Sequence, residues 1–151
     1  VPELDMSPSA SAVRAVVGLV TRGLLDPRLM SRTGGGRLLD VGCGSGNYLA
    51  RMQALGWEVQ GIDRSIHAVE RARRQWGVPV VVGCVPGTEL PPGPFDLITL
   101  WEVLEHLEHP RRALASLRDR LSPQGRVVLS VPNVSGWASR WFGKSWVAWD
   151  L

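Results

Sequence analysis

The residues best suited to chemistry lie in the run LLDVGCGSGN, which spans positions 38–47. This apolar run contains one acid, Asp40, and continues into Gly42, Gly44 and Gly46. Glycines let backbone approach a ligand closely because they carry no Cβ, and a following helix offers free N–H groups in its first turn. Dinucleotide folds use the spacing G-x-G-x-x-G, which sets a pyrophosphate on the helix N-terminus. The spacing G-x-G-x-G after a carboxylate instead favours a ligand with a cationic amino-acid part.

The DVGCGSG run resembles the first motif of the class I S-adenosylmethionine (SAM)-dependent methyltransferases. Four further segments match that family in order and spacing: GIDRS at 61–65, FDLIT at 95–99, WEVLEHLEHP at 101–110 and LSPQGRVVLSVPN at 121–133. The last two are similar to the branch that contains the ubiquinone-biosynthesis O-methyltransferases. The resemblance covers residues 37–133. It implies an enzyme that transfers the methyl group of SAM to a small-molecule acceptor, at oxygen, with S-adenosyl-L-homocysteine (SAH) as product.

The resemblance also implies where the cofactor binds. The amino-acid end of SAM would meet the glycine loop, Cys43 included, with Asp40 close enough to attract the ammonium. The alternative for Asp40 is a capping residue that only fixes the loop. Asp63 follows Asp40 by 23 residues, close to the offset of ~20 expected for an acid that binds ribose hydroxyls. A carboxylate accepts both hydroxyl protons of a ribose diol, although a plain helix-start acid would also explain Asp63.

The adenine and the sulfonium have candidate partners as well. Arg64 would flank the adenine, together with Cys84 and Val85 after the third strand. Relatives often carry Asp or Asn at the position of Cys84. Because a thiol is a weak donor and acceptor, the adenine would rely on backbone groups or on Glu89. Trp101 would lie near the sulfonium, since aromatic faces attract cations; ordinary core packing explains this tryptophan equally well.

Methyl transfer is an in-line displacement that needs alignment more than covalent help. Alignment of the reacting atoms is worth roughly 7–11 kcal/mol. A base is needed only where the acceptor is protonated at neutral pH. His106 is the catalytic candidate, because an imidazole with an ordinary pKa of ~6.5 can accept a proton there.

The segment around His106 is expected to be a short helix over 101–107. Glu102, Glu105, His106 and His109 stand at i, i+3, i+4 and i+7, so a helix would place them on one face. Three interpretations stay open: a solvated face, a face over the methyl acceptor, and a divalent metal held by Glu102, Glu105 and His106. EVLEH resembles the Glu-x-x-Glu-His segment of metal-dependent methyltransferases that act on RNA 3′ ends or on catechol-like quinone precursors. No fourth ligand is identifiable.

Three other functions compete with small-molecule methylation. The glycine spacing disfavours a nicotinamide-dependent oxidoreductase. A methyltransferase-like module that holds SAM or SAH without turnover stays open, and so does a metal-assisted RNA methyltransferase. The net charge is +3 and arginines cluster at 71–74 and 111–112. These clusters suit a nucleic-acid partner, but solvated helix faces explain them better, and the sequence does not fix the oligomeric state.

Strands alternate with helices along the chain, which predicts a doubly wound, Rossmann-like α/β fold with a mostly parallel sheet of about five strands. The strands are expected at 37–41, 58–62, 79–83, 95–100 and 126–131, and the helices between them at 47–55, 65–76, 101–107 and 110–121. Ser65 is a candidate N-cap and Gly77 a candidate C-cap. Consecutive valines in the third strand favour burial on both faces. Ligands of such sheets bind beyond the carboxyl ends of the strands, where all five motifs fall.

Three regions are expected: a tail and leading helix in 1–36, the cofactor domain in 37–133, and the start of a substrate cover in 134–151. Family members add two further strands as an antiparallel hairpin at the sheet edge. We therefore expect the C-terminal hairpin strands to be missing from a truncated chain, with the fifth strand left as an exposed edge. This expectation puts the activity of the chain in doubt, though not its cofactor site.

The last region is rich in tryptophan, and it contains Trp137, Trp141, Trp146 and Trp149. A hydrophobic lid, orphaned core residues and membrane-interface contact are the alternatives. No apolar run approaches the ~20 residues that span a bilayer, and the first residues lack the pattern of a secretory signal. The only cysteines, Cys43 and Cys84, fit a reducing compartment, so a cytoplasmic location is expected.

Overall fold

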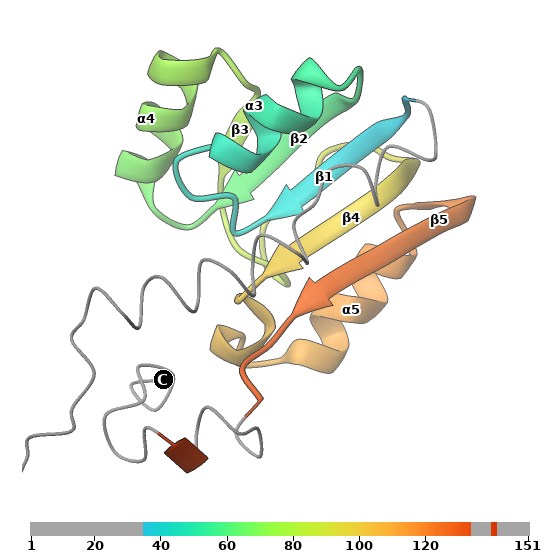
Figure 1. The fold of residues 1–151 in the computed structure, drawn as a ribbon. Helices are drawn as coiled ribbons and strands as arrows, with labels where there is room; N and C mark the ends of the chain where they lie inside the picture. The colour runs from blue at the N-terminus through green and yellow to red at the C-terminus, as the bar shows by residue number, and fades with distance from the viewer. Residues whose placement is uncertain (1–34, 134–139, 142–151) are drawn as a thin grey trace, which may run out of the picture. The chain divides into compact units, whose positions relative to one another are not determined.

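The computed structural model describes residues 35–133 and 140–141. Five strands form one parallel sheet in the order β3-β2-β1-β4-β5. The strands are β1 (Arg37–Val41), β2 (Glu58–Asp63), β3 (Val80–Val82), β4 (Phe95–Trp101) and β5 (Leu121–Ser130). The helical elements are α3 (Asn47–Ala54), α4 (Ile66–Trp76), the 3₁₀ turn η2 (Leu104–His106) and α5 (Pro110–Arg118). With α3 and α4 on one face of the sheet and α5 on the other (Figure 1), the predicted doubly wound α/β fold is confirmed.

These elements lie in one compact unit, which takes in the described residues 35–132. The predicted leading helix in 1–36 and three of the tryptophans, Trp137, Trp146 and Trp149, lie outside the described residues. The predicted limits of the three regions therefore stay predictions. Within the described part, no helix combines the length and the apolar composition that crossing a membrane requires.

The helix ends follow the local chemistry of the sequence. The Ser65 side chain accepts a hydrogen bond from the Ala68 N–H at 3.3 Å and so caps α4, as predicted. Gly77 ends α4 in the left-handed conformation with φ of 66°, which a residue without Cβ adopts at little cost. Pro110 stands in the first turn of α5, where a missing N–H loses nothing. Both ends of α4 and the start of α5 thus fall at residues that the sequence marks.

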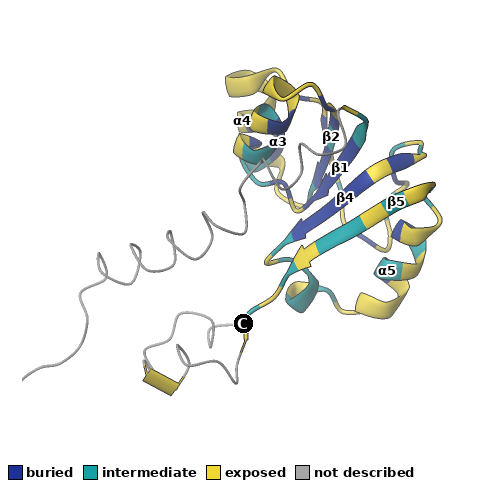
Figure 2. Cartoon of the chain, turned by 45° about the vertical axis from the view of Figure 1, so that its right-hand side comes forward, coloured by how far each residue is buried: buried dark blue, intermediate teal, exposed yellow. Residues whose placement is uncertain are grey.

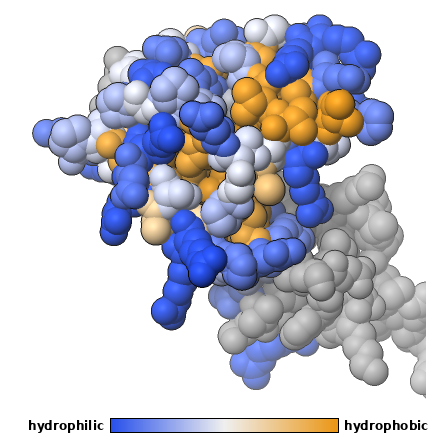
Figure 3. Space-filling model, turned by 180° about the vertical axis from the view of Figure 1, so that it is seen from behind, coloured by the Kyte–Doolittle hydropathy of each residue, from blue (hydrophilic) through white to orange (hydrophobic). Residues whose placement is uncertain are grey.

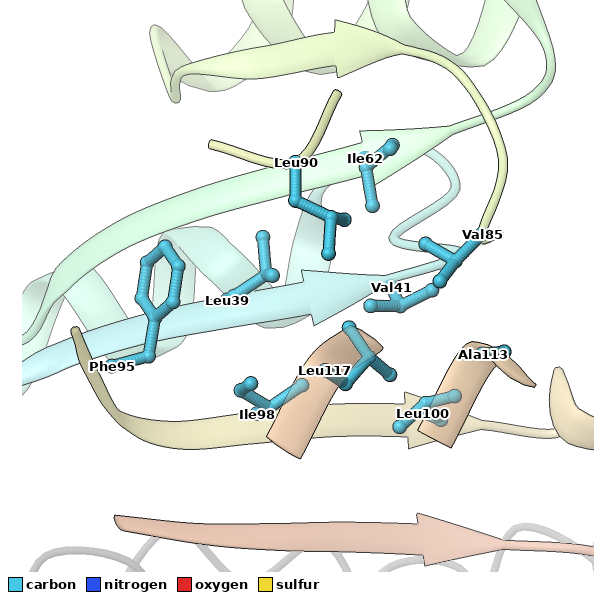
Figure 4. Packing of buried hydrophobic residues seen from close by; sticks show 10 residues of the cluster. All are labelled: Leu39, Val41, Ile62, Val85, Leu90, Phe95, Ile98, Leu100, Ala113 and Leu117. Atoms are coloured by element: carbon cyan, nitrogen blue, oxygen red, sulfur yellow. The ribbon is translucent and has the colours of Figure 1, made fainter. Parts of the chain in front are cut away.

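The hydrophobic core described here lies between the sheet and α5. Ala113 and Leu117 of α5 are fully buried against Leu39 of β1 and Ile98 of β4. Figure 4 shows these side chains pointing toward one another across the sheet face. The central strands β1 and β4 are mostly buried, whereas β5 carries no fully buried residue (Figure 2). The carboxyl ends of β1 and β4 are therefore held on a packed base.

The third strand corrects one prediction. Val81 and Val82 are 38% and 45% exposed, so the expectation that β3 is buried on both faces is wrong. The reason is position, because β3 is the last strand of the sheet and pairs only with β2. Figure 3, a view from behind, shows hydrophobic side chains gathered on part of the surface. Runs of valine therefore mark an edge strand here as well as they would mark a central one.

The segment after β4 corrects a second prediction. β4 continues to Trp101, and Glu102 then has φ of 54°, which ends regular structure. Only the short turn η2 follows, so residues 101–107 are not a helix. The expectation that Glu102, Glu105, His106 and His109 share one helix face is therefore wrong. The adjoining boundaries also move, since α5 ends at Arg118 and β5 already begins at Leu121.

Candidate cofactor site

The glycine loop between β1 and α3 depends on backbone that only glycine adopts freely. Gly42, Gly44 and Gly46 have φ values of 72°, 54° and 78°, all in the left-handed region. The Gly42 N–H donates to the Ile62 carbonyl at 2.8 Å, which ties the loop to β2. A Cβ built on Gly42 would lie 2.3 Å from Cγ2 of Val103, so the loop also has no room for a side chain there. The G-x-G-x-G spacing thus determines the path of the loop and lets Gly42 pack closely against Val103.

Asp63 stands at the end of β2 and connects two segments around the cavity. Its Oδ2 accepts from the Gly44 N–H and its Oδ1 from the Ser65 N–H, both at 2.8 Å. These bonds hold the carboxylate in place between the glycine loop and the start of α4. Each carboxylate oxygen keeps a further lone pair, so both oxygens can still accept protons from a diol. Asp63 is half-buried and lines the cavity described next.

A cavity of about 180 Å³ opens at the carboxyl ends of β1, β2 and β3. Five residues that the sequence analysis proposed line it: Gly42, Asp63, Arg64, Cys84 and His106. Segments up to 64 positions apart in the sequence therefore meet at one site, as the parallel topology requires. Sites for small ligands usually enclose about 300–1,000 Å³, so this cavity is large enough for only part of a nucleoside cofactor.

Asp40 lies beneath the loop rather than on the cavity wall. Its carboxyl is 2% exposed, and its Oδ1 accepts from the Thr99 hydroxyl at 2.6 Å. Burial raises the pKa of Asp40 to about 7, with a smaller contribution from the charge of Asp63, while the Thr99 bond lowers it. The hydrogen bond between Asp40 and Thr99 thus links β1 to β4, and the charge of Asp63 on the cavity wall acts on the Asp40 carboxyl. Its predicted attraction for an ammonium stays a prediction.

The remaining predicted cofactor residues have different positions. Cys43 is buried, and burial raises the pKa of its thiol to about 12, so it is a packing residue under the loop. Val85 is 3% exposed and belongs to the hydrophobic core. Neither side chain lines the cavity, and their contribution through the backbone stays a prediction. Glu89 lies instead in two other surface hollows and does not line this cavity.

Trp101 packs against an aromatic residue that the sequence analysis missed. Its ring meets the Tyr48 ring edge-on, with centroids 5.6 Å apart and planes at 76°. Tyr48 occupies the first turn of α3, immediately after the glycine loop. The position of Tyr48 in the sequence could have predicted its location, because a first-turn side chain after such a loop must lie near the ends of β1 and β4. The cavity-lining residues Val103 and Leu107 were also missed, because the helix expected over 101–107 does not form.

A family model described as a methyltransferase domain matches residues 20–150. The chain belongs to the methyltransferase domain family. The mitochondrial ubiquinone biosynthesis O-methyltransferase of Schizosaccharomyces pombe is 40% identical over 104 residues, which are 64% of this chain and 38% of that protein. The ubiquinone biosynthesis O-methyltransferase of Chromobacterium violaceum is 34% identical over 105 residues, which are 66% of this chain and 45% of that protein. The chain therefore spans less than half the length of these curated relatives.

A solved structure agrees with this assignment. The SAM-bound CalS10, an amino pentose methyltransferase from Micromonospora echinaspora involved in calicheamicin biosynthesis, matches with a TM-score of 0.64 and 28% identity. The match covers 74% of this chain and 49% of that one. The predicted family resemblance and the Rossmann-like fold are thereby confirmed.

In this methyltransferase domain the proposed catalytic and metal residues differ in their surroundings. His106 and Glu102 are both exposed, but only His106 lines the cavity. Both carboxylate oxygens of Glu105 are enclosed and have no hydrogen-bond partner among the described residues. Nowhere in the described residues do three His, Cys, Asp or Glu side chains come together as a metal site. The predicted metal set is therefore not assembled in this structure.

Proposed function

We propose that the chain binds SAM across the carboxyl ends of its strands and that the protein transfers the methyl group to a small-molecule acceptor, at oxygen. The observation that carries the proposal is Asp63, fixed on the cavity wall with lone pairs left for a ribose diol. The names of the relatives support the acceptor, because two of them are O-methyltransferases. The SAM bound to CalS10 supports the cofactor.

The residues present fit such a cofactor. The adenosine part would lie in the cavity, with the ribose on Asp63 and the adenine between Arg64 and Cys84. The glycine loop would let the rest of the molecule lie against backbone, since Gly44 has nothing within 4 Å of the position of a Cβ. When bound, SAM supplies a methyl group activated by a positively charged sulfur.

The contribution of the chain to the reaction is then positioning and proton transfer. The cavity walls would orient the acceptor oxygen on the side of His106. An acceptor hydroxyl must lose its proton as its oxygen forms the new bond to carbon. His106 lines the cavity and is exposed enough to pass that proton to water. We therefore propose His106 as the general base of the reaction.

Titration calorimetry with SAH and with NAD tests the cofactor. We expect SAH to bind the chain and NAD to give no heat. Asp63→Asn should weaken the binding of SAH by about tenfold or more, because an amide has only one oxygen to accept hydrogen bonds and carries no charge. Asp119→Asn, a change at an exposed acid on the far end of α5, is the matched control and should leave SAH binding unchanged. Heat with NAD and none with SAH would overturn the proposal.

A further inference from the structure

The solvent-facing side of α4 carries arginines that have no ion-pair partner among the described residues. Between positions 64 and 76 the chain has four arginines and one acid, Glu70. His67, Arg71 and Arg74 stand at i, i+4 and i+7, so they share one face of the helix, and all three are exposed. Within the described residues, neither Arg71 nor Arg74 forms an ion pair or a hydrogen bond. This face of α4 therefore presents positive charge to solvent.

Arg73 on the same helix shows what an arginine does where the fold uses it. Its Nε donates to the carbonyl of Val80, on the edge strand β3, at 2.9 Å. Arg71 and Arg74 have no such contact with the fold. A guanidinium offers five N–H donors in a planar fork that matches phosphate oxygens. Two free guanidinium groups on one helix face thus suit a ligand with several phosphates.

A hollow of about 480 Å³ adds an aromatic wall to this charged surface. The helices α3 and α4 lie next to each other on one face of the sheet (Figure 1), and both contribute to the hollow. It is lined by Asn47, Ala50, Arg51, Gln53, Ala54 and Trp76. The indole of Trp76 is 39% exposed, the two alanines leave room for a flat ring, and Arg51 adds a further charge. The amide of Gln53 can both donate and accept, as the edge of a nucleobase does.

An aromatic ring in a hollow beside exposed arginines is the combination that binds single-stranded nucleic acid. Bases stack on aromatic side chains, while the phosphates follow positive charge. An anionic membrane also attracts arginines, but the tryptophan of a membrane anchor faces the lipid. Trp76 instead forms the wall of a hollow that can accept a ring. Because a single strand is flexible, one base can enter the hollow while neighbouring phosphates lie along α4.

We propose that the face formed by α3 and α4 binds single-stranded nucleic acid, with a base stacked on Trp76 and phosphates on Arg51, Arg71 and Arg74. This role goes beyond the proposed function, since none of these four residues lines the cofactor cavity. Nucleic-acid binding and SAH binding can therefore be tested separately.

Fluorescence anisotropy with two labelled polyanions tests the proposal on the 151-residue chain. The probes are a short oligoribonucleotide of mixed sequence and heparin, which carries charge but no bases. Arg71→Gln combined with Arg74→Gln should weaken the binding of both probes and reduce the salt slope for RNA by about 1.4, because two phosphate contacts are lost. Trp76→Leu should weaken RNA binding by about fivefold or more and heparin binding by less than about twofold.

A second double variant is the matched control for net charge. Arg111→Gln combined with Arg112→Gln removes the same charge from exposed positions on α5 and should leave the salt slope for RNA as it is. Equal weakening by the two double variants would show attraction by net charge alone and overturn the proposal. So would a Trp76→Leu variant that binds RNA like the wild type, or binding to phosphatidylglycerol vesicles without binding to RNA.

Calorimetry with SAH separates this proposal from the proposed function. The α4 double variant should bind SAH like the wild type, and this result also shows that the variant is folded. A chain that binds SAH but not RNA retains its proposed function and loses only the nucleic-acid surface. Circular dichroism of Trp76→Leu shows whether its comparison is made between folded proteins, and the exposed arginines test the surface independently of it.

Discussion

The segment 40–46 together with Asp63, here called the loop wall, differs in its bonding from the segment 102–107, here called the acceptor wall. Both segments contribute residues to the cavity. In the loop wall, Asp63 accepts from two backbone N–H groups and the Gly42 N–H donates to β2. Every left-handed residue of this wall is a glycine. Its conformation is therefore the one that its sequence favours.

In the acceptor wall, the backbone conformation is not the one that the sequence favours. Glu102 is the one described residue other than glycine with a positive φ. Both carboxylate oxygens of Glu105 are enclosed, and neither has a hydrogen-bond partner among the described residues. Strained and unsatisfied groups persist where the surrounding structure enforces them, and they concentrate at functional sites. The comparison teaches that the loop wall is built for stability, whereas the acceptor wall carries costs.

The largest effect is expected from a side chain in the loop wall. Gly42→Ala should lower the free energy of unfolding by about 3–5 kcal/mol, because left-handed strain adds to a clash with Val103. It should also abolish SAH binding. Gly44→Ala is the matched control, since it is equally left-handed but has open space around the Cβ position; it should cost only about 1–2 kcal/mol. Urea unfolding measures both, and equal losses would show that the contact with Val103 does not matter.

The buried carboxyl of Asp40 in the loop wall lowers the stability of the fold when it is ionised, so stability depends on pH. The unfolded chain loses the Asp40 proton near the ordinary pKa of 3.8, while the folded protein keeps it up to about pH 7. The favourable contribution of this carboxyl to stability is therefore present below pH 3.8 and is lost as the pH rises to 7. Asp40→Asn removes the buried charge. It should raise the free energy of unfolding by about 3 kcal/mol at pH 8 and change it little at pH 4.

Denaturant titrations of the wild type and of Asp40→Asn across this pH range measure the effect. Asp119→Asn, which changes an exposed acid, should leave the pH dependence as it is. Parallel curves for wild type and Asp40→Asn would mean that folding does not shift the pKa of Asp40.

The same contrast explains what could be predicted from sequence. Ser65, Gly77 and the glycine loop were predicted correctly because local rules and tertiary structure demand the same residues there. Asp63 lies on the cavity wall because a fixed offset after a glycine loop reflects a fixed strand–helix–strand path, and its contact with a ribose stays a prediction. These features belong to the loop wall and its supports.

The failures fall where tertiary context overrides local pattern. The spacing of Glu102, Glu105 and His106 is helical, but β4 runs on to Trp101 and the chain then turns through a left-handed residue. No local signal announces a positive φ at a glutamate. The exposure of Val81 and Val82 follows from strand order, which is a property of the whole sheet. The contact of Tyr48 with Trp101 joins residues 53 positions apart in the sequence, so no local pattern predicts it.

A smaller effect is expected in the acceptor wall from Glu105. Glu105→Gln should raise the free energy of unfolding by about 1 kcal/mol, because a neutral amide costs less to enclose than a carboxylate without a partner. Glu108→Gln, an exposed neighbour, should change it by less than about 0.5 kcal/mol. Thermal unfolding with and without Mg²⁺ measures both. Stabilisation of the wild type by Mg²⁺ that Glu105→Gln abolishes would contradict this view and favour a metal ligand.

The smallest effect is expected at Glu102, where strain and chain entropy oppose each other. Glycine relieves the left-handed strain, worth about 1–2 kcal/mol, but loses about 0.5–1 kcal/mol through the greater freedom of the unfolded chain. Glu102→Gly should therefore raise the free energy of unfolding by about 0.5 kcal/mol, whereas Glu102→Ala keeps the strain and should not stabilise. Both variants keep the Glu102 N–H bonds to Ser130. A loss of stability in Glu102→Gly would mean that interactions of the glutamate side chain offset the strain of its left-handed backbone. The two walls would then differ less in stability than their φ angles indicate.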